Sequence, residues 1–172
     1  MKRIKLLVPT LLVGVLALVI AGAVSAKKPS LSATPVFKLH LKPSQEVPPI
    51  KGLKASAKGH VTFDLERSSA GAITSGEVVF YFNYSFPGAV TIDGLHIHQA
   101  AKGVNGPVVV SSGVTPIVDA DGQGNVTAIV TGTSPPTLQA ILDNPRGYYV
   151  NLHTTANPLG ALREQMRNPT KG

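Results

Sequence analysis

The chain of 172 residues contains no cysteine and no tryptophan, and only 5% of its residues are aromatic. The lack of cysteine excludes disulfide bonds, thiolate metal ligands and thiol nucleophiles. Any metal ion would have to be bound by histidine, carboxylate or water. Charged residues are also few, at 15%, and the interleaved basic and aromatic residues of single-strand nucleic-acid binders are missing. We therefore expect no nucleic-acid partner.

Apolar runs long enough to cross a membrane are absent outside the N-terminus. Residues 2–5 include three basic side chains, residues 6–24 form an uncharged apolar run, and Val24-Ser25-Ala26 offers the small residues that precede a cleavage point. This pattern predicts a signal peptide over residues 1–26 and an exported protein that is periplasmic, cell-surface or secreted. A run of 19 residues is also long enough to span a bilayer, so an uncleaved N-terminal anchor is the alternative, and the one membrane contact that we expect.

The remaining residues, 27–172, have the length of one domain. Without the three basic residues of the signal, 13 of the 16 basic residues remain against 9 acidic ones, which gives a net charge of +4. Such a mild excess predicts at most a weak attraction to anionic surfaces. Residues 27–35 are rich in serine and proline and predict a flexible lead.

Alternation of apolar and polar residues dominates the rest of the chain and predicts strands with one polar face. Glycine and proline, at 17 and 14 residues, are spread throughout, so long helices are not expected. One short helix is predicted over residues 136–142, and turns over residues 68–71, 86–88, 121–124 and 157–160. The predicted strands cover residues 36–42, 60–65, 76–84, 90–98, 107–110, 126–131, 148–153 and 161–166.

Strands at this hairpin-like spacing predict an all-β fold, an antiparallel β-sandwich of immunoglobulin-like or Cu/Zn superoxide dismutase-like Greek-key type, with at most one short helix. We expect the domain to cover residues 36–166 and a short tail to cover residues 167–172.

Three histidines are the candidate functional residues. In an extended strand His96 and His98 lie on the same side, and Leu95 and Ile97 face the core. The same alternation places His153 outside a later strand. If the two strands are neighbours, three imidazoles converge on one solvent-facing patch, which is the ligand count of an open transition-metal site.

Four motifs in order resemble a CHRD (chordin-type) domain over about residues 36–166. They are Gln45-Glu46-Val47-Pro48-Pro49, then His96-Ile97-His98 with Gly103-Val104-Asn105-Gly106-Pro107, then Tyr149-Val150-Asn151-Leu152-His153-Thr154, and Asn157-Pro158-Leu159-Gly160-Ala161-Leu162-Arg163. The family usually has an acid where this chain has Ala161, which weakens any role for that position. The resemblance implies a β-sandwich, export, and a binding or structural module without established catalytic activity.

Two functions therefore remain. The first is this non-enzymatic module, with a protein or surface partner that the sequence does not identify. The alternative is a copper- or zinc-binding protein that uses His96, His98 and His153 for storage, delivery or redox protection; the arrangement resembles the copper half of Cu/Zn superoxide dismutase. A metal-dependent oxidoreductase on the same site is a weaker third hypothesis, because no bridging histidine or zinc loop is evident. The competing structural explanation is that these imidazoles hydrogen-bond turn backbone and bind no metal.

Other polar residues have structural interpretations. His40 and His60 lie on polar strand faces and are expected to be solvated. Asn151 shares the parity of His153 and is expected either to orient an imidazole or to form a cross-strand hydrogen bond. Glu46 is expected to anchor the proline-rich segment that follows it. Arg163 is expected to form a surface ion pair with Glu46, Asp93 or Glu164.

Overall fold

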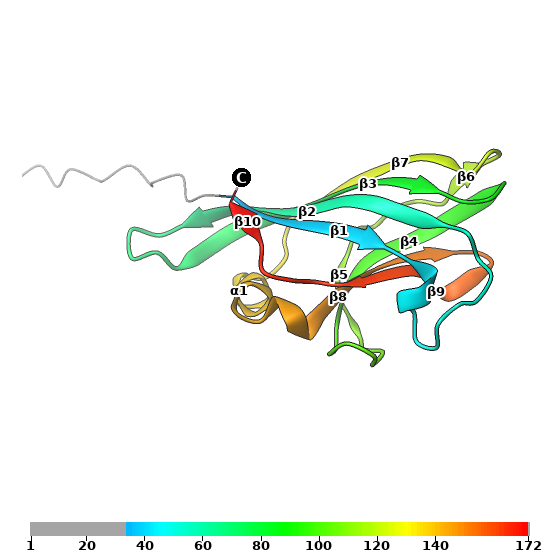
Figure 1. Cartoon of the computed structure of the whole chain (residues 1–172). Helices are drawn as coiled ribbons and strands as arrows, with labels where there is room; N and C mark the ends of the chain where they lie inside the picture. Colours follow the sequence, from blue (N-terminus) through cyan, green and yellow to red (C-terminus); the bar gives the residue numbers. More distant parts are fainter. Residues whose placement is uncertain (1–33, 172) are drawn as a thin grey trace, which may run out of the picture.

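The computed structural model describes residues 34–171 and shows two antiparallel sheets packed face to face (Figure 1). The predicted signal peptide, residues 1–26, lies outside the described residues. Within residues 34–171, no helix is long and apolar enough to cross a membrane.

Sheet A has the strand order β10-β1-β2-β3-β7, formed by β10 (Thr170–Lys171), β1 (Pro35–Leu41), β2 (Ser56–Arg67), β3 (Ile73–Ser85) and β7 (Gln123–Val130). Sheet B has the order β5-β4-β8-β9, formed by β5 (Val108–Ser111), β4 (Val90–Gln99), β8 (Tyr148–Thr154) and β9 (Asn157–Gln165). A further strand, β6 (Ile117–Asp119), pairs with the first residues of β4. The hairpin of β2 and β3 extends beyond the rest of the sandwich (Figure 1).

Alternate side chains of each sheet fill the space between the two layers. Phe80 and Phe82 of β3 and Val150 and Leu152 of β8 are fully buried in one continuous core. Leu95 and Ile97 of β4 join them, as their parity predicts. This burial confirms the all-β sandwich and leaves the histidines of β4 and β8 on the opposite side of sheet B.

Helical structure in the described chain is limited to one α-helix, α1 (Pro135–Asp143), and two 3₁₀ turns, η1 (Pro43–Gln45) and η2 (Pro145–Gly147). Ser134 caps α1 because its hydroxyl accepts a hydrogen bond from the Thr137 N–H, at 3.3 Å. Leu138 and Ile141 are the buried residues of the helix. The prediction of one short helix in this segment is confirmed.

One turn is wrongly placed by the sequence pattern. Residues 157–160 were expected to form a turn because they contain proline and glycine, but they are the first residues of β9. The chain reverses instead at Thr155 and Ala156, because Thr154 already pairs with Asn157. Because β9 begins at Asn157, the Pro158 carbonyl lies beside His153.

Candidate metal centre

Three histidines from two neighbouring strands converge on the outer side of sheet B. Strands β4 and β8 pair directly, with Gly94 opposite His153 and His96 opposite Asn151. One ring nitrogen from each of His96, His98 and His153 lies within 4.8 Å of one from each of the others. The ring centroids are 4.8–5.6 Å apart. The structure therefore brings together all three of the predicted candidate ligands.

A glycine makes room for the rings. Gly94 has the same parity as His96 and His98, and a Cβ at this position would lie 3.0 Å from His96 Cε1 and 3.2 Å from the Cβ of His153. Both distances are shorter than nearly all real contacts of this kind. Gly94 was not among the predicted site residues, although it lies two residues before His96 and shares its parity.

Two of the three rings are enclosed rather than solvent-facing, and His96 is partly buried, which corrects the expectation of a solvent-facing patch. His98 and His153 are only 7% and 9% exposed, and every residue of β8 is buried. The segment after β4 crosses over this side of sheet B, where the Gly106 N–H donates to the Tyr149 hydroxyl. The Asn105 side chain in turn donates to the Val47 carbonyl. Two distant loops thus cover a face that the alternating pattern would leave in water.

Backbone carbonyls fix the tautomers of two imidazoles. His98 Nδ1 lies 2.9 Å from the Gly106 carbonyl oxygen, and His153 Nδ1 lies 3.0 Å from that of Pro158. A carbonyl oxygen can only accept, so each Nδ1 carries the hydrogen and each neutral ring keeps its lone pair on Nε2. This is the arrangement in which an outer hydrogen bond orients a metal-ligating histidine.

Three nitrogens are left without a partner in this enclosed space. The Nε2 atoms of His98 and His153 and Nδ1 of His96 are buried and have no hydrogen-bond partner within the described chain. Leaving a buried polar atom unpaired costs about 1–3 kcal/mol. These nitrogens belong to the three-histidine group that, among residues 34–171, could hold a metal ion, and an unpaired imidazole lone pair is a metal ligand.

Burial also keeps His96 and His98 in the form that ligates metals. It lowers the pKa of His96 to about 4, with smaller contributions in the same direction from His153 and His98. Burial lowers the pKa of His98 as well, and it outweighs the hydrogen bond that His98 donates to the Gly106 carbonyl, which acts in the opposite direction. Neutral imidazole is the ligand for transition metals, so at neutral pH His96 and His98 need not lose a proton to bind one.

A second buried polar group lies beside the histidines. Glu46 is 6% exposed, and burial raises its pKa to about 7 despite the opposing influence of Arg163 and of a hydrogen bond with Asn151. Gly160 is needed here, because a Cβ would lie 2.5 Å from Asn151 Nδ2 and 2.8 Å from Glu46 Oε2. Asn151 thus contacts Glu46, and the role of orienting imidazoles belongs to the Gly106 and Pro158 carbonyls.

Arg163 is not a surface residue, contrary to the sequence-based expectation. It is 2% exposed, and its guanidinium carbon lies 3.4 Å from the centroid of the Tyr149 ring. Its Nη1 donates to Asn105 Oδ1 at 2.9 Å and its Nη2 donates to the Val104 carbonyl at 2.7 Å. No carboxylate of the described residues forms an ion pair with it. Arg163 instead stabilises the loop around Val104 and Asn105, which covers His98, through these hydrogen bonds.

The other two described histidines lie outside this group. His40 and His60 are partly exposed on the outer side of sheet A, where the His60 ring lies 5.5 Å from that of Tyr81. The candidate ligand group therefore contains His96, His98 and His153 alone.

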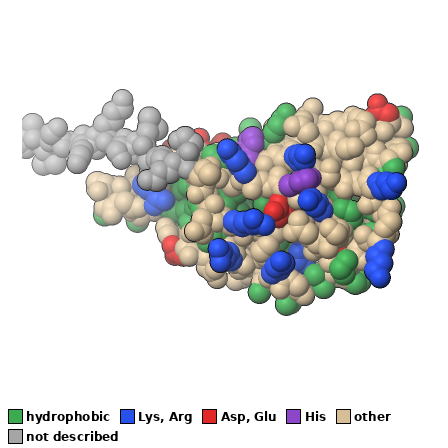
Figure 2. Space-filling model, in the orientation of Figure 1, with side chains coloured by type: hydrophobic (Ala, Val, Ile, Leu, Met, Phe, Trp, Pro, Cys, Tyr) green, Lys and Arg blue, Asp and Glu red, His purple; other side chains and the backbone are tan. Residues whose placement is uncertain are grey.

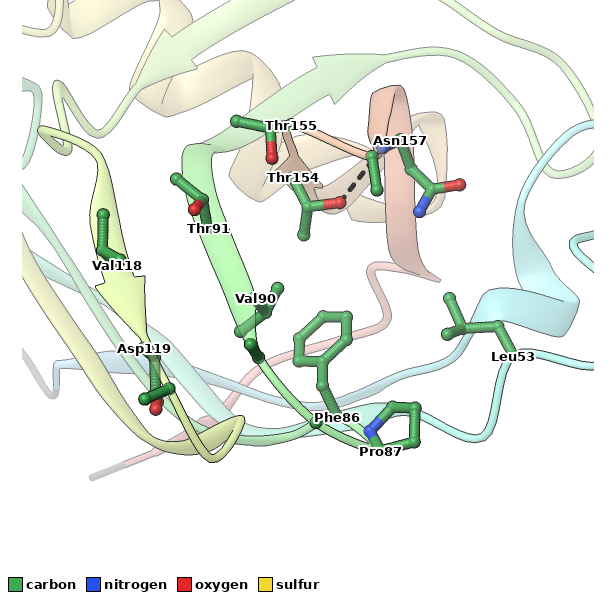
Figure 3. Close-up of a pocket in the computed structure, with 14 residues that line it drawn as sticks. Leu53, Phe86, Pro87, Val90, Thr91, Val118, Asp119, Thr154, Thr155 and Asn157 are labelled. Atoms are coloured by element: carbon green, nitrogen blue, oxygen red, sulfur yellow. Dashed lines mark hydrogen bonds between the residues drawn. The ribbon is translucent and has the colours of Figure 1, made fainter.

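A cavity of about 620 Å³ lies at the end of the sandwich where β4 begins, and none of the three histidines lines it (Figure 3). Its lining is largely apolar and includes Phe86 and Val90. Its one carboxylate, Asp119, already accepts hydrogen bonds from the Tyr84 hydroxyl and from the N–H groups of Asp121 and Gly122. These hydrogen bonds tie β6 to β3 and to the turn before β7.

The molecule is thus a two-layer β protein whose outer sheet face carries an enclosed polar cluster. The family model described as the CHRD domain matches residues 37–166. The chain belongs to the CHRD-domain family, as the four motifs indicate, and this supports a non-catalytic binding or structural module. No curated protein and no solved structure matches the chain.

Proposed function

We propose that this CHRD-domain protein binds one transition-metal ion through His96 Nδ1, His98 Nε2 and His153 Nε2. The main support for the proposal is that three buried imidazole nitrogens, which have no hydrogen-bond partner within the described chain, converge from two neighbouring strands. Metal–imidazole bonds of about 2.0–2.1 Å would place two ligating nitrogens no more than about 4 Å apart. The rings would therefore close in slightly on the ion.

The ligand set favours copper or zinc. It consists of three neutral nitrogens, with no carboxylate in the group. Calcium and magnesium prefer oxygen ligands, whereas imidazole suits copper and zinc. Among divalent ions, copper is expected to bind more tightly than zinc at a given nitrogen site.

Binding, rather than catalysis, is the role that we propose for the ion, as in storage, delivery or redox protection outside the cytoplasm. The membership of the CHRD-domain family supports this role. Three protein ligands leave a fourth position for water or a small molecule, which is the feature that would favour a metal-dependent oxidoreductase as the second candidate.

Metal analysis of untagged protein, combined with titration by copper and zinc, tests the proposal. We expect one ion per chain, and at least a hundredfold lower affinity for His98→Ala, because one of three ligands is lost. His60→Ala is the matched control and should bind as the wild type does, because His60 lies on the other sheet. A wild-type protein that takes up no stoichiometric copper or zinc would overturn the proposal.

A further inference from the structure

The three-histidine group offers a metal ion no negative ligand. No carboxylate among residues 34–171 belongs to the group, and each of its three members contributes a neutral imidazole nitrogen. A divalent ion bound here would therefore keep its charge of two, whereas a monovalent ion would keep a charge of one. The charge of the ion thus affects how well this site can hold it.

The enclosure of the site makes this difference large. His98 and His153 are 7% and 9% exposed, so an ion between them loses much of its contact with water. The cost of moving an ion from water into a medium of low dielectric constant rises with the square of its charge. It is therefore about four times larger for a divalent ion than for a monovalent ion of the same size. Without a negative ligand to offset this cost, the site favours the smaller charge.

A positive charge is held close to one of the three ligands. Strand β8 lies between β4 and β9, so the Tyr149 ring is contacted by His98 from one side and by Arg163 from the other. The His98 and Tyr149 rings are nearly parallel, with centroids 4.8 Å apart, and the guanidinium carbon lies 3.4 Å from the Tyr149 centroid. Burial is the main cause of the lowered pKa of His98, and the charge of Arg163 acts in the same direction. Arg163 therefore disfavours further positive charge at this ligand.

The buried acid near Arg163 does not reverse the sign of this charge. Glu46 is the one acid among the buried residues of the described chain, and burial raises its pKa to about 7 despite the opposing influence of Arg163. Below about pH 7 the two side chains together carry one positive charge, and above it they are neutral. They do not supply the site with a net negative charge.

Charges farther from the site do not supply one either. Asp93 of β4 acts on the pKa of His96, but less strongly than burial and the other two histidines do. Its side chain is exposed, so water and salt screen its charge. Residues 27–172 carry a positive net charge, and on the molecular face seen in Figure 2 lysine and arginine side chains outnumber acidic ones. The wider surroundings thus also favour an ion of low charge.

We propose, on the basis of the metal binding proposed above, that the three histidines bind copper as the monovalent ion in preference to the divalent ion. Imidazole suits both copper and zinc, but zinc has no redox chemistry and stays divalent. Three nitrogens complete a trigonal set of ligands for copper(I). One electron from a small reductant such as ascorbate converts bound copper(II) to copper(I), and no bond to the protein has to form or break.

Competition with chelators tests this preference on the wild-type protein. Bicinchoninate competes for copper(I) in the absence of oxygen and with ascorbate present, and nitrilotriacetate competes for copper(II). We expect a dissociation constant at least tenfold lower for copper(I), which places the reduction potential of the bound couple at least about 59 mV above that of aqueous copper. Copper(II) bound as tightly as copper(I) would overturn the preference and leave the proposed metal binding standing. A protein that binds neither ion would overturn both.

Two variants of Arg163 test the part that charge plays in the preference. Both lose the planar guanidinium and its hydrogen bonds, but Arg163→Lys keeps the positive charge and Arg163→Gln removes it. The ratio of copper(I) to copper(II) affinity should fall at least threefold in Arg163→Gln and should stay within twofold of the wild type in Arg163→Lys. Equal ratios in the two variants would refute the role of the Arg163 charge, and the wild-type measurement decides the preference even where a variant does not fold.

Discussion

The outer faces of the two sheets carry the same residue type in the same alternating pattern but in opposite environments. On sheet A, His60 is partly exposed, and its neighbours on the same face of β2, Lys58 and Thr62, are exposed and partly exposed. On sheet B, His153 belongs to a strand in which every residue is buried. The difference arises from the covering loops, which hydrogen-bond to Tyr149 and Arg163. The alternation of apolar and polar residues along a strand thus identifies the side chains that lie outside the sandwich core. It does not show whether these side chains are exposed to water.

The largest expected effect of this difference is on stability. Arg163→Ala should lower the free energy of unfolding by about 3 kcal/mol, because it removes a cation–π contact and two hydrogen bonds from a charged donor. Lys58→Ala, an exposed cation on β2, should change it by less than about 0.5 kcal/mol. Urea denaturation measures both. Equal losses in the two variants would show that the covered face is no more important to folding than the open one.

A second test uses pH. Between about pH 4.5 and pH 7 the folded protein retains a proton on Glu46 that the unfolded chain releases. This site therefore lowers the free energy of unfolding as pH rises, by an amount of order 1–3 kcal/mol. Glu46→Gln should remove that decline, so the variant should be more stable than the wild type at pH 8 and similar to it at pH 4.5.

Glu77→Gln is the matched control for the pH test, because Glu77 is an exposed acid on β3 of sheet A. Its denaturation midpoint should follow that of the wild type from pH 4.5 to pH 8. If Glu46→Gln and Glu77→Gln gave the same pH dependence, the assignment of Glu46 as a buried acid with a raised pKa would be wrong.

The smallest predicted effect concerns the space for the rings. Gly94→Ala should reduce copper affinity about tenfold, because the new methyl group would press on His96 and His153. Gly88→Ala is the control, since a Cβ there meets nothing within 4 Å. Competition with a copper chelator of known affinity measures both variants. An unchanged affinity for Gly94→Ala would mean that the rings bind the ion in another arrangement.

Much of this architecture could be predicted from local pattern. Alternation predicted the strands over residues 76–84 and 148–153, in which Phe80 and Val150 are buried, and the pattern over residues 136–142 predicted the helix that buries Leu138 and Ile141. These predictions succeed because strand parity and helix periodicity depend only on nearby residues. The pairing of β4 with β8 brings the histidines together, but it depends on residues far apart in the chain. From the sequence, the convergence of the histidines could be predicted only on the assumption that these two strands are neighbours.

The covered face could not be predicted for the same reason. Arg163 looks like a surface residue in the sequence because its burial depends on Val104 and Asn105, about sixty positions away. The turn over residues 157–160 was misplaced because the Thr154–Asn157 pairing overrides the local preference of proline and glycine. Side-chain contacts between distant segments decide the first case, and the hairpin pairing of β8 with β9 decides the second.

Strand β10 pairs with the start of β1, with Lys171 opposite Pro35, so both ends of the described chain leave from one corner (Figure 1). A pull applied across these ends would peel the two-residue pairing apart one hydrogen bond at a time, instead of shearing a long ladder. Under tension the molecule would therefore fray at this corner first, while β4 and β8 stay paired.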